Sequence, residues 1–244
     1  MKRVFVNRSL KEEVLLDTEQ THHILRVLRH DTNKALPFVS AEEGTMANYE
    51  FVSMEGKESL WHRVSDVLSL EKKAPIVLIQ SLLKGEKLEF ILQKAVELEA
   101  DAVFLVGTAH SVAKLDENKA VKKKERWEKI MWEAAQQSGR SFLPNLIIAK
   151  NIPNLLELKN QLYPDIRSYI AYENEEGLTL KTALQEGFPM EGVCCMIGPE
   201  GGLGAEEVEA LCAAGFTSVS LGDTILRAET AAIYAISALH FIRS

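Results

Sequence analysis

The chain has 244 residues, of which 46% are hydrophobic and 26% charged, and its formal net charge is −7. This composition is typical of globular proteins and excludes a disordered or fibrous chain. Taken over the whole chain, the negative charge argues against nucleic acid as a partner. No apolar run approaches the roughly 20 residues of a membrane helix, and the N-terminal residues lack the apolar core of a signal peptide. We therefore expect a cytoplasmic protein that does not bind membranes.

The cysteines and histidines suggest neither a disulfide framework nor a metal centre. Cys194, Cys195 and Cys212 have no zinc-binding or disulfide spacing, and the adjacent pair lies in an apolar run typical of a buried strand. His22 and His23 have no cysteine or carboxylate at ligand spacing nearby. We expect core packing for the cysteine pair and no structural metal.

Residues 1–70 are β-rich and are predicted to form a small barrel-like domain. One helix is predicted over residues 19–29, with apolar residues on one face. Short strands bounded by turn residues are predicted at 4–6, 35–39, 49–52 and 63–68. Residues 71–75 form a plausible linker.

From residue 76 to residue 244 strands and helices alternate. Strands are predicted at 76–80, 102–106, 146–149, 168–172, 193–197 and 218–221. Helices are predicted at 86–99, 118–138, 154–162, near 180, 205–214 and 228–242. This alternation predicts an α/β domain with a mainly parallel sheet and helices on both faces. Ligands of such sheets bind outside the carboxyl ends of the strands.

A glycine-rich loop ends the apolar strand at 193–197 and leads into a helix. Its order, Gly198-Pro-Glu-Gly-Gly202, fits neither the dinucleotide-binding fingerprint nor a phosphate-binding P-loop. Glu200 would repel phosphates, so a cationic or neutral ligand with amine and hydroxyl donors, such as S-adenosylmethionine, fits better. An ordinary strand–turn–helix corner is the alternative interpretation.

A second strand–glycine–helix junction follows at residues 221–230. It places Gly222 in the turn and Arg227 beside the first turn of the last helix. A cation there is unfavourable to the helix dipole by about 0.3–1 kcal/mol unless it meets an anion. That anion is either a ligand group or an internal carboxylate, with a salt bridge to Glu229 as the structural alternative.

Two basic clusters offer local exceptions to the acidic character of the chain. Arg26 and Arg29 lie close to three histidines, and six cations lie between Lys119 and Lys129. Screening limits the reach of charge to about 8–10 Å, so a basic patch can act on an acidic protein. A solvated helix face is the alternative for each cluster. Arg140, just beyond the predicted helix cap at Gly139, is suited to bind RNA phosphate or to offset the helix dipole.

Eight segments, taken in order along nearly the whole chain, resemble the RsmE-type methyltransferases of the SPOUT superfamily. These enzymes act on N3 of a uridine in 16S (small-subunit) ribosomal RNA. Residues 197–202 and 225–231, at this separation, are the most specific of the eight. The others are 22–29, 84–89, 93–98, 111–114, 126–127 and 133–138.

The resemblance implies a PUA-like N-terminal β-barrel, a SPOUT domain with a deep trefoil knot, and a homodimer. It implies S-adenosyl-L-methionine as the cofactor, and ribosomal RNA or the small ribosomal subunit as the partner. The implied cofactor-binding residues lie in three loops. They are Ala171, Tyr172, Glu173, Ile197, Gly198, Pro199, Glu200, Gly201, Gly202, Ser220, Leu221, Gly222, Ile225, Leu226, Arg227 and Thr230.

The catalytic candidates are Arg227 and Arg140, as positive charges that favour the anionic form of uridine N3, and Glu200. Glu200 would act as a base or orient the amine of the cofactor. The expected RNA contacts are Arg8, His23, Arg26, Arg29, Lys114 and Arg140. Two alternatives stay open, a SPOUT methyltransferase with another RNA target and a non-catalytic RNA-binding assembly factor.

The chain departs from the family pattern at three places that concern RNA contacts more than the cofactor loops. His110 stands where an arginine is common, and Asp223-Thr224 stands where a basic residue is common. Residues 32–34 replace a usual Gly-Asp pair. These departures motivate the non-catalytic alternative.

Overall fold

The computed structural model describes residues 3–40, 43–112 and 117–244, and the chain divides into two compact units. The first unit comprises Met1–Glu71 and Ala135–Leu143, and the second comprises Lys72–Ala134 and Pro144–Ser244. The return of residues 135–143 to the first unit was not indicated by any sequence pattern.

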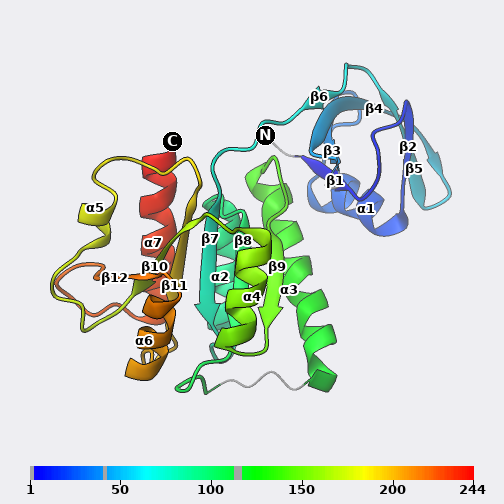
Figure 1. Ribbon diagram of the computed structural model, residues 1–244. Helices are drawn as coiled ribbons and strands as arrows, with labels where there is room; N and C mark the ends of the chain where they lie inside the picture. The colour runs from blue at the N-terminus through cyan, green and yellow to red at the C-terminus, as the bar shows by residue number, and fades with distance from the viewer. Residues whose placement is uncertain (1–2, 41–42, 113–116) are drawn as a thin grey trace. The chain divides into compact units, whose positions relative to one another are not determined.

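The first unit contains one six-stranded sheet, with the order β1-β3-β4-β5-β2 and with β6 paired to β4 (Figure 1). The pair β1/β3 is parallel, and the other pairs are antiparallel. Three aromatic side chains, Phe38, Tyr49 and Trp61, fill the core, and the Phe38 ring stacks on Tyr49 with centroids 4.5 Å apart. The strands are β1 (Val4–Val6), β2 (Glu13–Leu16), β3 (Leu36–Ser40), β4 (Thr45–Glu55), β5 (Glu58–Arg63) and β6 (Leu68–Ser69).

The structure corrects two predicted elements of this unit and adds a strand. The strand predicted at 63–68 is wrong, because β5 ends at Arg63 and the chain pairs again only at Leu68. The helix predicted at 19–29 is instead α1 (Thr18–His22) followed by a π-helix, η1 (His23–Val27). Asp17 caps α1 by accepting a hydrogen bond from the backbone N–H of Gln20 at 2.8 Å. Strand β2 was not predicted.

The second unit is built on a six-stranded sheet with the order β12-β10-β11-β7-β8-β9. Every neighbouring pair in it is parallel. The predicted α/β fold with a parallel sheet is therefore confirmed. The strands are β7 (Ile76–Ser81), β8 (Ala102–Val106), β9 (Asn145–Ala149), β10 (Arg167–Ala171), β11 (Val193–Ile197) and β12 (Thr217–Val219).

Helices cover both faces of this sheet (Figure 1). On one face Leu155 of α4 and Leu211 of α6 share a buried core with strand residues such as Met196. On the other face α7 packs against β7, β11 and α2. No helix in the described part of the chain is long and apolar enough to cross a membrane. The helices are α2 (Glu86–Glu97), α3 (Glu117–Ser138), α4 (Ile152–Leu162), α5 (Leu180–Ala183), α6 (Ala205–Ala213) and α7 (Ala228–Arg243).

The adjacent cysteines of β11 are buried as predicted. Burial raises the pKa of Cys195 to about 12 and raises that of Cys194 further, so both thiols stay protonated and act as core side chains. Cys212 is exposed.

The strand order decides where a ligand can bind. Because β12, β10 and β11 are neighbours and parallel, their carboxyl ends meet at one edge of the sheet. The three loops that follow these strands therefore converge, although β10 and β12 are separated by 45 residues of sequence between Ala171 and Thr217. This is the edge at which parallel α/β sheets bind ligands.

Candidate active site at the carboxyl edge of the parallel sheet

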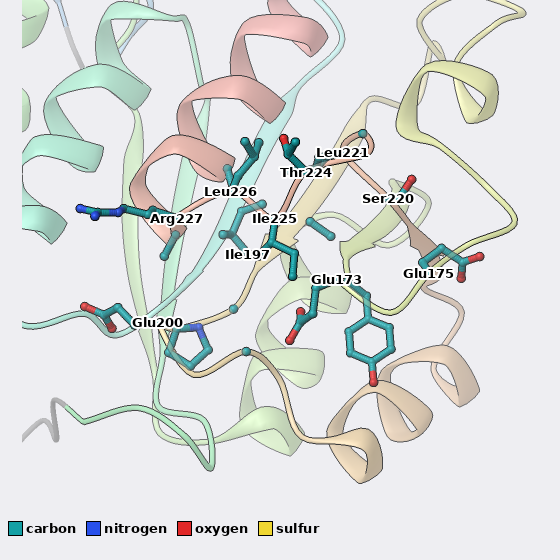
Figure 2. A pocket seen from close by; sticks show the side chains of 18 of the residues that line it. Glu173, Glu175, Ile197, Glu200, Ser220, Leu221, Thr224, Ile225, Leu226 and Arg227 are labelled. Carbon is teal, nitrogen blue, oxygen red and sulfur yellow. The ribbon is translucent and has the colours of Figure 1, made fainter.

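The loops after β10, β11 and β12 line a cavity of about 370 Å³ (Figure 2). Lys87 of α2 and the first two turns of α7 complete the lining. The size lies within the range of about 300–1,000 Å³ that is usual for small-molecule sites. A backbone-rich lining from three loops is suited to bind the edges of a ligand through N–H and C=O groups.

The cavity gathers all the predicted cofactor-binding residues except Gly201 and Thr230. Thr230 is exposed on α7. A Cβ atom on Gly201 would lie 3.1 Å from the Cβ of His110, so that glycine faces the segment after β8. The lining residues that the sequence did not predict are Lys87, Glu175, Asp223, Thr224, Ala228 and Ala231.

Glycine is favoured at two points of the loop after β11. Gly202 has a φ of +73°, and a Cβ there would collide with the carboxylate of Glu173. A Cβ on Gly198 would lie 3.2 Å from the Cγ of Leu203, so the loop folds back closely on itself. The Nε2 of Gln80, a buried residue of β7, donates to the carbonyl of Gly198 at 3.3 Å. The loop is thus fixed from the sheet side.

A second set of contacts holds the loop from the side of residues 107–111. Nδ1 of His110 donates to the carbonyl oxygen of Gly201 at 3.0 Å, because a carbonyl can only accept. Glu207 caps α6 by accepting from the Gly204 N–H at 2.9 Å, and also accepts from the Ala109 N–H at 2.8 Å. His110, one of the departures from the family pattern, therefore contacts the backbone of the glycine loop.

Lys87 carries the ion pairs of the cavity. Its Nζ lies 3.1 Å from Oε1 of Glu200 and 3.9 Å from Oε2 of Glu229. Partial burial raises the pKa of Glu200, but its own backbone N–H and the ammonium groups of Lys87 and Lys84 more than offset this effect and hold the pKa below its ordinary value. Glu200 is therefore ionised at neutral pH and is a weak base.

Arg227 lies beside the start of α7 as predicted, and its side chain is exposed. Within the described residues, its guanidinium has no ion pair or hydrogen bond, so the salt bridge to Glu229 that the sequence left open is not formed. In Figure 2 the side chains of Arg227 and Glu200 extend toward the same side of the view, away from Ser220 and Glu175. A free cation at a ligand cavity is available for an anionic or electron-rich group.

Two further carboxylates of the lining have different surroundings. Glu175 accepts from the backbone N–H groups of Gly177 at 2.8 Å and Leu178 at 3.2 Å. These bonds hold the pKa of Glu175 below its ordinary value and order the loop after β10. Glu173 is exposed and has no hydrogen-bond partner within the described residues, so its oxygens are free to accept from a ligand.

Arg140, predicted as a second catalytic cation, does not line this cavity. It belongs to the first unit, and its side chain is only 6% exposed. A buried guanidinium is held by internal partners, so Arg140 is a buried residue outside this cavity, and its assignment as a catalytic residue or an RNA contact stays a prediction.

The other predicted RNA contacts fall in the first unit, apart from Lys114, which lies outside the described residues. Arg26 and Arg29 are exposed, and Arg29 has a φ of +47° just after the π-helix. Arg8 is exposed and donates to the carbonyl of Leu15. His23 is half-buried, and its Nε2 has no hydrogen-bond partner among the described residues.

The comparisons with known proteins now decide the family. The model of the RNA methyltransferase domain family matches residues 70–240. The chain is 34% identical to Ribosomal RNA small subunit methyltransferase E of Bacillus subtilis over 226 residues, which are 91% of this chain and 88% of that protein. This chain belongs to the ribosomal RNA small subunit methyltransferase E family.

Solved structures of methyltransferases are similar in fold to nearly the whole chain. The methyltransferase E of Neisseria gonorrhoeae, bound to S-adenosyl methionine, has a TM-score of 0.82 and 27% identity, covering 99% of this chain and 97% of that one. A putative methyltransferase of Legionella pneumophila in complex with the cofactor SAM has a TM-score of 0.81 and 26% identity, covering 98% and 96%. The α/β fold with its parallel sheet is therefore that of a methyltransferase.

The sequence does not indicate the lysine that carries the ion pairs of this cavity, Lys87. Lys87 lies in the segment 84–89, which resembles the family, and this resemblance is the only sign in the sequence that the lysine belongs to the site. Its role stayed hidden because its partner Glu200 is 113 residues away in sequence, and only the tertiary structure brings α2 to the glycine loop.

Proposed function

We propose that this chain transfers a methyl group from S-adenosylmethionine to N3 of a uridine in small-subunit ribosomal RNA. The observation that carries the proposal is the cavity at the carboxyl edge of β10, β11 and β12 in a chain of the methyltransferase E family. Relatives of the same fold are described as bound to S-adenosylmethionine.

The residues of the cavity fit this cofactor. Its acidic lining, which includes Glu173, Glu175 and Glu200, disfavours a phosphorylated ligand and suits a cationic sulfonium and an amine. The apolar side chains of Ile197 and Leu226 are suited to contact an adenine face. When bound, S-adenosylmethionine supplies a methyl group that its cationic sulfur makes electrophilic.

In this proposal Arg227 favours the reactive form of the substrate. Uridine N3 loses its proton to solvent water well above neutral pH, so a positive charge near the uracil oxygens is needed to stabilise the anion. The N3 lone pair would then take the methyl group as the bond between sulfur and methyl breaks, with S-adenosylhomocysteine as the leaving group. Arg227 is exposed at the cavity and unpaired within the described residues, and it is the candidate for that charge. We assign Glu200 the orientation of the cofactor amine rather than base catalysis, because Lys87 holds it ionised.

Family membership favours catalysis over the alternative of a non-catalytic assembly factor. His110, whose departure from the family pattern motivated that alternative, has a structural role in this chain, because it donates to the glycine loop. The other alternative, a methyltransferase with a different RNA target, is distinguished by the mapping of methyl groups described below.

The proposal extends to the arrangement of the whole chain. Residues 1–70 act as a PUA-like RNA-binding barrel with Arg26 and Arg29 exposed, residues 71–75 as a linker, and 76–244 as a knotted SPOUT domain. The chain works as a homodimer in the cytoplasm. Support for the dimer is an apolar groove of about 300 Å³ beside α7, lined by the exposed rings of Tyr234 and Phe241.

The test of the catalytic role replaces Arg227 with Ala. We expect Arg227→Ala to lower kcat by about 10²–10³-fold, the usual loss for a residue that stabilises developing charge, with a Kd for S-adenosylmethionine within a few fold. Arg167→Ala removes a surface ion pair to Glu191 and serves as the control. Unchanged methyl transfer by Arg227→Ala would contradict the assignment.

The test of the target maps methyl groups on ribosomal RNA from cells that lack the protein. We expect the loss of one N3-methyl group from a small-subunit uridine, restored by the wild-type gene and not by Arg227→Ala. Loss of a methyl group from another RNA would show that the target is different, while the chain would still be an RNA methyltransferase.

A further inference from the structure

We propose that Lys87 is a positioning residue that keeps Arg227 available to the substrate by occupying the carboxylates of Glu200 and Glu229. The inference rests on the proposed function, because it assigns Lys87 a task within the same site. It concerns a residue that does not itself act on the methyl group.

Lys87 joins three elements of the site. It lies in the first turn of α2, while Glu200 lies in the loop after β11 and Glu229 lies in the first turn of α7. Its Nζ donates to Oε1 of Glu200 at 3.1 Å and lies 3.9 Å from Oε2 of Glu229. One ammonium group therefore compensates the negative charges of two carboxylates, which belong to the loop after β11 and to α7.

Partial burial makes the attraction between Lys87 and the two carboxylates stronger than that of an ordinary surface ion pair. The side chains of Glu229, Glu200 and Lys87 are 20%, 32% and 42% exposed. Oε2 of Glu229 is buried and has no hydrogen bond within the described residues, so the ammonium at 3.9 Å is the nearest compensation the structure gives it. Partial burial weakens solvent screening, and the interaction between these charges strengthens accordingly.

Lys87 and Arg227 are the two cations among the described residues that line the cavity. With Lys87 in place, both carboxylates are compensated and Arg227 stays unpaired within the described residues. Without Lys87, Glu200 keeps only the weaker electrostatic effect of Lys84, and Arg227 is the remaining cation among the described residues that line the cavity to compensate it. An ion pair between Arg227 and Glu200 would withdraw the guanidinium from the substrate.

The test is a double-mutant cycle between Lys87 and Arg227, with kcat measured at saturating S-adenosylmethionine. We expect Lys87→Met to lower kcat by about 10- to 100-fold, the range that loss of a supporting contact to a functional group typically costs. Lys87→Arg keeps the charge and is expected to retain most of the activity. Because Lys87 acts through Arg227, adding Lys87→Met to Arg227→Ala is expected to lower kcat by less than about 3-fold.

A second variant separates positioning from direct substrate contact. Lys87→Met combined with Glu200→Gln removes the carboxylate that would capture Arg227, so kcat should return to within about 5-fold of Glu200→Gln alone. Lys94→Met, on the same helix and paired with Glu97 outside the cavity, is the matched control and should match wild type. Thermal unfolding of each variant identifies any loss caused by misfolding.

The outcomes distinguish this inference from the proposed function. If the losses of Lys87→Met and Arg227→Ala multiply, or if Glu200→Gln gives no rescue, Lys87 acts directly and the inference is overturned. If Lys87→Met has normal kcat while Arg227→Ala is impaired, the inference fails and the proposed function stands. If Arg227→Ala is fully active, the proposed role of Arg227 fails first.

Discussion

At the scale of single residues, Gly202 is a position of the site where the backbone conformation favours glycine. Its φ of +73° is unfavourable to any other residue, and a Cβ atom would strike the Glu173 carboxylate. We expect Gly202→Ala to weaken S-adenosylmethionine binding by at least about 10-fold, because a displacement of Glu173 or of the loop, at about 1–3 kcal/mol of strain, disturbs the cavity. Calorimetric titration measures the effect.

Gly215→Ala is the control for this substitution. Gly215 also has a positive φ, of +92°, but a Cβ there meets nothing within 4 Å, and it does not line the cavity. It should lose about 1–2 kcal/mol of stability from backbone strain with unchanged affinity. Equal affinities of the two variants would show that the contact with Glu173 is unimportant.

Glu175 makes the stability of the cofactor loop dependent on pH. Its pKa is lowered from the ordinary value of 4.5 by hydrogen bonds from the backbone N–H groups of Gly177 and Leu178, so the carboxylate stabilises the fold above that value and loses this effect as pH falls through the lowered pKa. Glu175→Gln should lower the thermal midpoint at pH 7 by at most about 2–4 °C, the equivalent of about 1 kcal/mol. The difference from wild type should shrink as pH falls below 4.5 and vanish once pH lies below the lowered pKa, where Glu175 of the wild type is protonated. A difference that grows toward acid pH would contradict the assignment.

The residues of the site were predictable to the extent that they lie in contiguous loops. Glycines and the Glu200 carboxylate in one short segment indicated a ligand loop that does not bind phosphate, and the cavity contains that segment apart from Gly201. Lys87 and the burial of Arg140 depend on contacts between distant segments, which the residue pattern does not encode. The tertiary structure decides which group pairs with a charged side chain.

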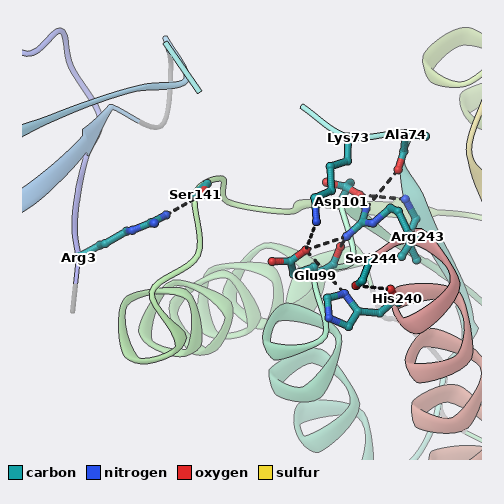
Figure 3. Close-up of polar contacts among 10 residues, drawn as sticks. Arg3, Lys73, Ala74, Glu99, Asp101, Ser141, His240, Arg243 and Ser244 are labelled. Carbon is teal, nitrogen blue, oxygen red and sulfur yellow. Dashed lines mark hydrogen bonds and ion pairs between the residues drawn. The ribbon is translucent and has the colours of Figure 1, made fainter. Parts of the chain in front are cut away.

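At the scale of elements, the last helix, α7, is fixed at its C-terminal end by Arg243 (Figure 3). The guanidinium, whose side chain is 5% exposed, donates to Asp101 Oδ2 at 2.7 Å and to Glu99 Oε2 at 3.1 Å. It also donates to the carbonyls of Ala74 at 3.2 Å and Glu99 at 3.0 Å. Because α7 carries Arg227 and Glu229 at its other end, this anchor helps to set the position of the site.

Arg243→Ala should therefore destabilise the protein by about 2 kcal/mol. Breaking a fully buried ion pair costs about 3–5 kcal/mol, and the partial exposure of Asp101 and Glu99 lowers that figure. Urea denaturation followed by circular dichroism measures the loss. Arg167→Ala, which removes an exposed pair, should cost less than about 1 kcal/mol, and equal losses would refute the anchor.

The elements of the second unit were predictable because hydrophobic periodicity decides them. Strands β8 and β11 begin and end at the predicted residues, since both are continuous apolar runs buried on two faces. In the first unit, β2 buries only Val14 and Leu16, and β5 buries Ser59 together with Trp61. The Ser59 hydroxyl accepts from Trp61 Nε1 at 2.9 Å and bonds with Thr21 at 2.8 Å, an interior polar network that a search for apolar alternation does not find.

At the scale of the whole molecule, the site and the proposed dimer surface are continuous. The residues 220–222 line both the cavity and the apolar groove beside α7. A partner that covers the groove would thus contact a loop that lines the cavity. Neither periodicity nor composition indicates this continuity, because it arises from the meeting of β12 and α7 in the folded unit.

The proposed dimer predicts that Phe241→Asp disrupts association and weakens cofactor binding together. Phe241 is 83% exposed in the single chain, and burying such a ring contributes about 1.5–3 kcal/mol, counted twice in a two-fold symmetric interface. The dimer Kd should therefore rise by more than about 100-fold in sedimentation velocity experiments. Met190→Asp, a substitution at an apolar residue that is 89% exposed outside the groove, should leave both properties unchanged. The Kd for S-adenosylmethionine should also rise in Phe241→Asp, because the partner subunit no longer covers the 220–222 loop. Normal affinity in a monomeric variant would show that each subunit binds the cofactor alone.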